Sequence, residues 1–328
     1  MATPVLRLGL IGFGTVGQAF ARGLAQSADR LASRLSARIR LARVAVRVPQ
    51  KVQPAWPDLR IGDDPLALAS DPSVDIVVEA TGADTACGWL TTALNRGAVT
   101  VSANKQAVAG SLPLLQALAD RHPLFHCEGA VAAAIPIVRA LREGLDGEDI
   151  LDIRGILNGT STFILSEVER GAEFAAAFAR AESLGFAERG SRADIDGSDA
   201  AAKLAILAST AWRTPIVRER VRVRGFDERI VAQARQAFGA QRRVRLVAEA
   251  WQADGPRLIV EPRVLDGDDP LATVTGVTNA VELTAVLAGQ LRWFGPGAGG
   301  DRTASALLGD VLAGARTLLS GGLGRVAA

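Results

Sequence analysis

The chain has 328 residues, 48% of them hydrophobic, which is enough to bury a large core in two domains rather than one. Its 37 basic and 35 acidic residues nearly balance, so the net charge of +2 gives no reason to expect nucleic acid as a partner. Two cysteines are too few for a disulfide framework, and no apolar run reaches the roughly 18 residues of a membrane span. We therefore expect a cytoplasmic protein without a signal peptide or a membrane segment.

The N-terminal segment carries a glycine pattern typical of dinucleotide-binding proteins. An apolar strand pattern leads into GFGTVG at residues 12–17, and a helical pattern follows. In this context the first glycine allows a tight turn, the second lets the backbone approach a pyrophosphate, and the third lets the helix pack on the strand. A purely structural glycine-rich turn is the alternative. The predicted cofactor-binding residues of this loop are Gly12, Gly14, Thr15, Val16 and Gly17.

The second strand pattern, residues 39–46, bears on the choice between NAD and NADP. A carboxylate for the ribose 2′-hydroxyl of NAD is expected near its end, and none is present. Arg47 and Lys51 follow instead, and two cations there would hold the 2′-phosphate of NADP. The sequence therefore favours NADP over NAD, with two solvated bases on a loop as the alternative.

Two further strand patterns, residues 75–79 and 98–102, are each followed by a short loop. Ligands of open α/β sheets bind beyond the carboxyl ends of the strands, so these loops are expected to line the nicotinamide site. For Lys105 the alternative is an ordinary lysine at the start of a helix. The residues predicted to contact the cofactor there are Thr81, Gly82, Ala103, Asn104 and Lys105. A strand pattern at 124–128 then leads into small residues, 129–136, which let backbone approach backbone or a ligand.

The pattern changes near residue 150, where strands follow one another without long helices between them. This arrangement suggests an antiparallel or mixed sheet. In residues 216–224 valine alternates with arginine and glutamate as in a half-exposed strand, and the interleaved acid and missing aromatics argue against nucleic-acid binding. The predicted elements are strands at 150–157, 216–224, 244–250 and 257–262, at least one strand within 274–288, and helices from the polar turn 158–162 to residue 170 and at 173–184.

A glycine-rich segment, residues 295–300, precedes a helical pattern at 303–319 that we expect to pack back on the first domain. The predicted fold class is α/β, with a Rossmann-type doubly wound parallel sheet and a second α+β domain. The dinucleotide-binding domain is predicted at 1–128, completed by the C-terminal helix 301–328, and the substrate-binding domain at 129–300.

Residues 187–211 bring together an ammonium and several carboxylates. A loop with Glu188, Asp194 and Asp196 precedes a helix for which Ser198 is a good N-cap. Asp199 and Lys203 stand four residues apart on the shoulder of the helix's apolar stripe. The alternative is an ordinary surface ion pair at helical spacing.

The scarcity of lysine favours a chemical role for Lys203. Lysine occurs only at positions 51, 105 and 203, while the other basic residues are arginines. A lysine retained in such a chain suggests a task that arginine cannot perform, and proton transfer is one.

Seven motifs, found in one order over nearly the whole chain, resemble homoserine dehydrogenase. They are GFGTVG at 12–17, SANK at 102–105, GILNGTSTFIL at 155–165, LGFAE at 184–188, ADIDGSDAAAKLAILA at 193–208, DDPLATVTGVTNAV at 268–281 and GPGAGGDRTASALLGDVL at 295–312. The resemblance implies reversible NAD(P)-dependent oxidation of L-homoserine to L-aspartate 4-semialdehyde in threonine, methionine and isoleucine biosynthesis. It also implies a homodimer formed through the second domain, and a short form without a regulatory ACT domain or a fused aspartate kinase.

The resemblance also assigns roles to individual residues. Lys203 matches the proton donor and acceptor at the substrate γ-oxygen, and Lys105 the second active-site lysine. The residues matching substrate-binding or acidic active-site positions are Glu188, Asp194 and Asp199. Those matching glycines that touch the cofactor are Gly185 and Gly299. Those matching a sodium site built from backbone carbonyls are Glu128, Val131, Ala133 and Ile135.

The sequence departs from the family pattern at three places. Val48 follows Arg47 where an Asp is common, which bears on the cofactor preference. Thr162 and Phe163 stand where Asn-Tyr is usual, and alanines at 132–134 replace a largely glycine run, so added methyl groups could crowd the carbonyl cage. Two other functions remain open. One is an oxidoreductase of the same plan that acts on another amino acid or semialdehyde, and the other is a dinucleotide-binding sensor without catalysis.

Overall fold

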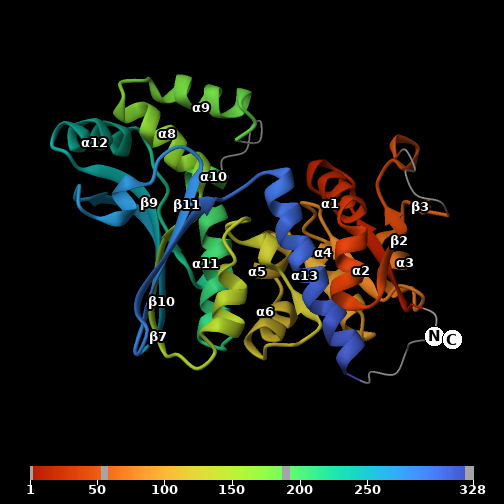
Figure 1. The fold of residues 1–328 in the computed structure, drawn as a ribbon. Coiled ribbons are helices and arrows are strands. Elements are labelled where there is room, and N and C mark those ends of the chain that lie inside the picture. The colour runs from red at the N-terminus through yellow and green to blue at the C-terminus, as the bar shows by residue number, and fades with distance from the viewer. Residues whose placement is uncertain (1–2, 53–57, 187–192, 322–328) are drawn as a thin grey trace. The chain divides into compact units, whose positions relative to one another are not determined.

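The computed structural model describes residues 3–52, 58–186 and 193–321. The chain divides into two compact units, with Met1–Ala133 and Gly299–Ala328 in unit 1 and Ala134–Ala298 in unit 2 (Figure 1). In the described ranges no helix is both long and apolar enough to cross a membrane.

Unit 1 contains a parallel sheet with the strand order β3-β2-β1-β4-β5-β6. The chain adds β2 and β3 on one side of β1 and then β4, β5 and β6 on the other side. This is the doubly wound arrangement expected of a Rossmann-type fold. Its elements are β1 (Val5–Ile11), α1 (Thr15–Gln26), α2 (Ala28–Leu35), β2 (Arg38–Ala45), η1 (Pro49–Lys51), β3 (Arg60–Gly62), α3 (Pro65–Ser70), β4 (Ile76–Glu79), α4 (Ala86–Asn95), β5 (Val99–Ser102), α5 (Lys105–Ala109), α6 (Leu112–Ala119), β6 (Phe125–His126), η2 (Glu128–Ala130) and α13 (Gly300–Ser320).

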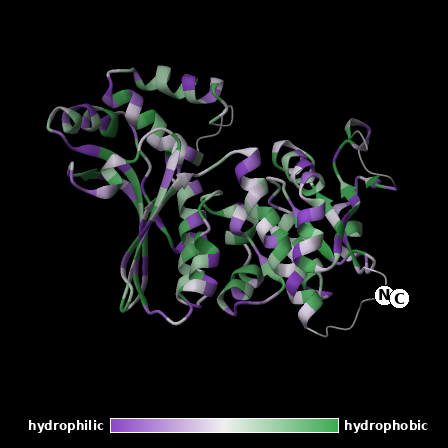
Figure 2. Ribbon diagram, viewed as in Figure 1, coloured by the Kyte–Doolittle hydropathy of each residue, from purple (hydrophilic) through white to green (hydrophobic). Residues whose placement is uncertain are grey.

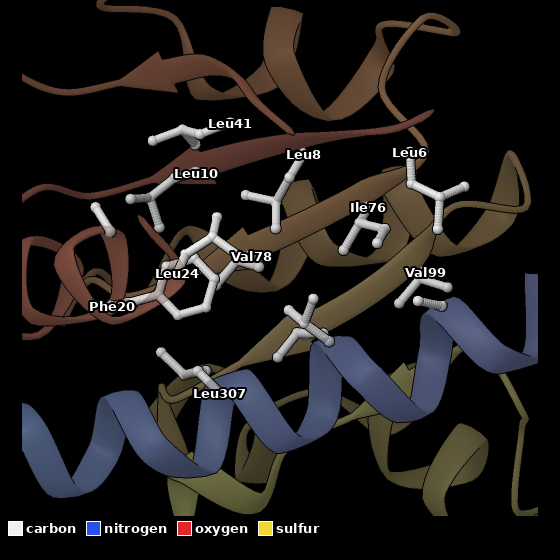
Figure 3. Packing of buried hydrophobic residues seen from close by; sticks show 14 of the residues in the cluster. Leu6, Leu8, Leu10, Phe20, Leu24, Leu41, Ile76, Val78, Val99 and Leu307 are labelled. Carbon is white, nitrogen blue, oxygen red and sulfur yellow. The ribbon is translucent and has the colours of Figure 1, made fainter. Parts of the chain in front are cut away.

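The C-terminal helix α13 completes the core of unit 1. It lies beside α1 although almost the whole chain separates them (Figure 1). Leu8 of β1, Phe20 of α1 and Leu307 of α13 are fully buried and meet in one cluster (Figure 3). Since burying one such side chain contributes about 1.5–3 kcal/mol, this cluster accounts for the docking of α13.

Unit 2 contains a mixed sheet with the order β12-β11-β7-β9-β10-β8, antiparallel except where β8 meets β10. The two sheets confirm the predicted fold class. The elements of unit 2 are α7 (Ile137–Arg139), the π-helical turn η3 (Ala140–Gly144), β7 (Ile150–Ile156), α8 (Gly159–Glu169), α9 (Phe174–Ser183), α10 (Ala193–Asp196), α11 (Ser198–Ala211), η4 (Arg218–Arg220), β8 (Arg222–Val223), α12 (Glu228–Gly239), β9 (Arg243–Ala253), β10 (Gly255–Leu265), η5 (Pro270–Thr273), β11 (Thr278–Ala285) and β12 (Gly289–Pro296).

Helix α11 is the central helix of unit 2 and packs on β7, β9 and β10. All of its residues from Asp199 to Thr210 are buried, so it is surrounded by protein on every side. By contrast, α12 carries both hydrophobic and hydrophilic residues along its length, as a helix with one exposed face does (Figure 2). The complete burial of α11 determines the environment of Asp199 and Lys203.

Two predicted strands are wrong in extent. Only Arg222–Val223 of residues 216–224 is a strand, because it pairs with two residues of β10 at the edge of the sheet and a 3₁₀ turn precedes it. Likewise β6 is limited to Phe125–His126, and Glu128 begins a 3₁₀ turn. In both places the residue pattern suits a strand, but only two residues pair with the neighbouring strand.

Candidate active site

The loop between β1 and α1 fits a bound pyrophosphate. Gly12 has φ of +94°, a left-handed conformation that favours glycine, and a Cβ on Gly17 would lie 2.2 Å from the carbonyl oxygen of Gly12. Around Gly14, in contrast, a Cβ would meet no atom within 4 Å. Two glycines are therefore needed for close packing, and the third leaves room for a ligand.

The start of α1 offers donors for an anion. Its N-cap is Gly14, which has no side chain that could accept a hydrogen bond from the first N–H groups of the helix. Helix N-termini of this kind bind phosphate groups. Beside it lies a cavity of about 320 Å³, lined by Thr15, Gln18, Ala19, Arg22, Gly300 and Asp301. The glycine-rich loop and the N-terminus of α1 therefore fit the pyrophosphate of a dinucleotide.

Glu79, at the end of β4, connects the two loops predicted to contact the nicotinamide. Its side chain is fully buried. One carboxylate oxygen accepts hydrogen bonds from the Thr81 N–H at 2.7 Å and the Thr81 hydroxyl at 2.5 Å. The other accepts one from the Ser102 hydroxyl at 2.6 Å, and Ser102 in turn accepts the N–H of Asn104 at 3.0 Å. Burial raises the pKa of the Glu79 carboxyl, and hydrogen bonds from Ser102 and Thr81 oppose this shift.

Asn104 carries this network to the start of α5. Its side-chain oxygen accepts the Ala107 N–H at 3.1 Å, so Asn104 is the N-cap of the helix whose first residue is Lys105. Lys105 is half-buried. The sequence analysis missed Glu79, although a glutamate that ends a wholly apolar strand is a signal that could have identified it.

The residues predicted to hold a 2′-phosphate both follow β2 in the chain. Arg47 is exposed, two residues beyond β2, and Lys51 is the last residue of η1. Val46, the one residue between β2 and Arg47, is not acidic.

Lys203 lies in a buried polar cluster of unit 2. Its Nζ donates to the carbonyl oxygen of Leu157 at 2.7 Å and to Oδ2 of Asp199 at 2.7 Å. Lys203 is 8% exposed and Asp199 5%. The shoulder position predicts two side chains that are neither fully buried nor fully exposed, and this is wrong, because α11 is covered on all sides. A buried ammonium needs paired acceptors, and this one has a carboxylate and a main-chain oxygen.

Asn158 joins this cluster to Asp194. Its Nδ2 donates to Oδ1 of Asp194 at 2.6 Å and to Oδ2 of Asp199 at 2.8 Å. The structure therefore brings together Asp194, Asp199 and Lys203, three residues that the sequence analysis selected. It missed Asn158, for which the signal was a polar residue between a strand and a helix start.

Two other predictions concern the loop before α11. The N-cap of this helix is Gly197, with φ of 88°, and Ser198 is its first residue, so the prediction of Ser198 as N-cap is wrong. Instead Asp196 accepts the Ser198 N–H at 2.8 Å. Glu188 lies outside the described residues.

The remaining predicted residues are distributed over both units. Gly299, with φ of 125°, precedes α13 in unit 1, and the exposed Gly185, with φ of 72°, follows α9 in unit 2. Among the predicted sodium ligands, Glu128, Val131 and Ala133 belong to unit 1 and Ile135 to unit 2. Over the described residues, no three His, Cys, Asp or Glu side chains gather as they do at a metal site made of side-chain ligands.

Comparisons with known proteins agree with this geometry. A family model of homoserine dehydrogenase matches residues 136–312, and a model of the homoserine dehydrogenase NAD-binding domain matches residues 12–128. A homoserine dehydrogenase of Mycobacterium leprae is 38% identical in an alignment of length 324 that covers 96% of this chain and 73% of that protein.

Solved structures give the same result. The crystal structure of a homoserine dehydrogenase from Thiobacillus denitrificans has a TM-score of 0.88 at 34% identity, covering 98% of this chain and 76% of that one. A hyperthermophilic archaeal homoserine dehydrogenase in complex with NADPH has a TM-score of 0.78 at 27% identity, covering 94% and 97%. The chain belongs to the homoserine dehydrogenase family of NAD(P)-dependent oxidoreductases.

Proposed function

We propose that the chain interconverts L-homoserine and L-aspartate 4-semialdehyde, with Lys203 as the acid and base at the substrate γ-oxygen. The observation that carries this role is the buried Lys203 ammonium, held at 2.7 Å by both Leu157 and Asp199. A lysine can give up its proton and an arginine cannot, which suits a group that must titrate. This explains why lysine is retained in a chain that otherwise uses arginine.

The chemistry separates into a hydride and a proton. Oxidation removes a hydride from the γ-carbon of homoserine and a proton from its hydroxyl, and neutral Lys203 accepts the proton. When bound, the nicotinamide supplies the hydride acceptor. In the opposite direction the Lys203 ammonium donates its proton to the aldehyde oxygen. Pairing with Asp199 favours the ammonium, the form required for reduction of the semialdehyde.

Carboxylates are proposed to bind the ammonium group of the amino-acid substrate. Asp194 and Asp199 supply two of them in unit 2, and Glu188 is proposed as a third. Charge-assisted hydrogen bonds of this kind are roughly twice as strong as neutral ones. Lys105 is proposed as the second lysine, on the nicotinamide side of the reaction.

The test is nicotinamide reduction with L-homoserine, followed by absorbance, with NAD and NADP in parallel and L-serine and L-threonine as control alcohols. The proposal predicts turnover of homoserine far above either control. Strong cofactor binding without homoserine turnover would favour a sensor or another substrate.

NADP is the proposed preferred cofactor. The support is the pair Arg47 and Lys51 after β2 and the lack of an acidic residue at the strand's end. An archaeal member of the family binds NADPH. The other proposed contacts are the glycine-rich loop, the loops at Thr81–Gly82 and Ala103–Lys105, and Gly185 and Gly299.

A sodium ion is proposed at the main-chain carbonyls of Glu128, Val131, Ala133 and Ile135. In support, Ala132 and Ala133 have φ of 52° and 34°, so this loop keeps a glycine-like backbone despite its methyl groups. The thermal midpoint of the protein should rise with sodium more than with equal tetramethylammonium or potassium. Equal midpoints in the three salts would contradict a sodium site.

A homodimer through unit 2 is also proposed. Trp251 of β9 and Phe294 of β12 are 40% and 50% exposed. Trp251 shares its strand face with Glu249, and Phe294 shares its strand face with Arg292, because side chains two residues apart point the same way. Exposed aromatic side chains of this kind are enriched in interfaces. Sedimentation of Phe294→Glu should give more monomer than wild type, whereas Leu287→Glu, at an exposed turn, should not. Equal masses for all three proteins would refute the interface.

A further inference from the structure

The side-chain amide of Asn158 uses every hydrogen-bonding group that it has. Asn158 is 3% exposed, and its Oδ1 accepts the N–H of Ser161 at 2.7 Å. Its Nδ2 donates one hydrogen bond to Asp194 at 2.6 Å and one to Asp199 at 2.8 Å. An amide nitrogen has two protons, so both are engaged. A flipped amide would set an oxygen against two carboxylates, and the orientation is therefore unique.

The two acceptors come from consecutive helices, and both are far from Asn158 in the sequence. Asp194 is in α10 and Asp199 in α11, 36 and 41 residues from Asn158. Because one nitrogen bridges them, their accepting oxygens lie within about 5 Å of each other, given ordinary hydrogen-bond lengths. Two carboxylates so close favour uptake of a proton by one of them, unless donors compensate.

The same carboxylate oxygen links Asn158 to the proposed acid and base. Oδ2 of Asp199 accepts from Nδ2 of Asn158 at 2.8 Å and from Nζ of Lys203 at 2.7 Å. The titratable groups connected through the amide are thus Asp194 on α10 and Asp199 and Lys203 on α11. A substitution of Asn158 therefore removes hydrogen bonds from Asp194 and Asp199 directly and acts on Lys203 only through Asp199.

We propose that Asn158 is a positioning residue for the reaction, which holds Asp194 and Asp199 ionised together and so aims Lys203. This inference rests on the proposed function. Asn158 is also the N-cap of α8, but Ser and Asp cap helices comparably well. Among side chains of this length, only asparagine has both an oxygen that accepts the Ser161 N–H and two N–H groups that donate to Asp194 and Asp199. Capping and positioning can therefore be separated by substitution.

The experiment compares Asn158→Ser and Asn158→Asp with wild type. Both variants keep an oxygen that can cap α8, and both lose the two donors. Measured are the pH profile of kcat/KM for L-homoserine, the KM for NADP and the thermal midpoint. As a matched control, Asp227→Ser changes the N-cap of α12, where Asp227 accepts the N–H groups of Arg229 and Ile230.

We expect kcat/KM near neutral pH to fall about tenfold or more in both variants, as for loss of a charge-assisted hydrogen bond. The acid limb of the profile should move to higher pH by about one unit, and further in Asn158→Asp, where a third carboxyl joins the cluster. The KM for NADP should stay close to wild type, the thermal midpoint should fall because two buried carboxylates lose a donor, and Asp227→Ser should leave the profile unchanged.

Wild-type profiles in both variants would overturn the positioning role. Lower activity with an unmoved acid limb would overturn it too, because the loss of a helix cap alone would lower activity without moving that limb. If either variant fails to fold, the other provides the same comparison. A wild type without homoserine turnover would overturn the proposed function, and this role with it. Turnover by wild type with unmoved variant profiles would overturn the positioning role alone.

Discussion

The Nζ atom of Lys203 lies 2.7 Å from the carbonyl oxygen of Leu157, a residue 46 positions earlier in the chain. This oxygen belongs to the main chain just beyond β7, so no side-chain substitution removes it. The position of the ammonium therefore depends on the packing of α11 against β7. It follows that the charge of Asp199 can be changed while Lys203 keeps one of its two acceptors.

Asp199→Asn tests the proposed binding of the substrate ammonium. The variant keeps the size of the side chain and removes its charge, and hydrogen bonds to charged groups contribute about 1.5–3 kcal/mol. The KM for L-homoserine should rise about tenfold or more, while the KM for NADP stays near the wild-type value. Steady-state kinetics with each substrate varied in turn provides the check. An unchanged KM for homoserine would remove Asp199 from the substrate site.

Arg47→Ala tests the cofactor preference. Arg47 is exposed, so solvent screens its interaction with the 2′-phosphate, and we expect the KM for NADP to rise only about five- to tenfold. The KM for NAD should not change, because NAD lacks that phosphate. Arg38→Ala, at the opposite end of β2, is the matched control. Equal rises for both cofactors would refute the proposed contact.

Gly17→Ala and Gly14→Ala should differ in their effect on stability. A Cβ at Gly17 would lie 2.2 Å from a main-chain oxygen, which cannot rotate away, so the free energy of unfolding should fall by about 1–3 kcal/mol. A Cβ at Gly14 meets nothing within 4 Å, so that variant should be as stable as wild type. Both should bind NADP more weakly. Urea unfolding and cofactor titration test the pair, and a destabilised Gly14→Ala variant would contradict this packing.

Glu79→Gln should change how stability depends on pH. The pKa of Glu79 is raised above its ordinary value of 4.5, because burial disfavours the charge. Its contribution to stability is therefore fully present below pH 4.5 and is lost as the pH rises through the raised pKa.

Glutamine cannot ionise, so the difference in unfolding free energy between wild type and Glu79→Gln should shift in favour of the variant as the pH rises, by up to about 1.4 kcal/mol per unit. Urea unfolding between pH 4.5 and 8 measures it. Asp254→Asn, which changes an exposed carboxylate, should run parallel to wild type. A parallel Glu79→Gln curve would show that Glu79 titrates as it does in the unfolded chain.

Local patterns predicted most of the fold. The glycine loop, the buried strands and α11 carry their signals within a few neighbouring residues, through spacing and periodicity. The segment 216–224 misled because alternation describes a half-exposed surface, while strand formation also needs a partner. Helix α12 was not predicted, although Asp227 caps it.

The polar networks of the candidate site could not be read from local patterns. The hydrogen bonds of Asn158 reach 36 and 41 residues along the chain, and that from Ser102 to Glu79 spans 23. Only the topology of the sheets makes these residues neighbours. Asp194, Asp199 and Lys203 could be selected from the sequence because they are close to one another in the chain.

The central claim is that Lys203 transfers the proton at the γ-oxygen, and the most direct measurement is kcat for homoserine oxidation by Lys203→Arg. Arginine keeps the positive charge and cannot lose its proton. With the affinity for NADPH intact by fluorescence titration, kcat should fall by a factor of about 10² to 10⁴, the usual contribution of acid–base catalysis. A variant that binds NADPH normally and keeps near wild-type kcat would contradict the claim.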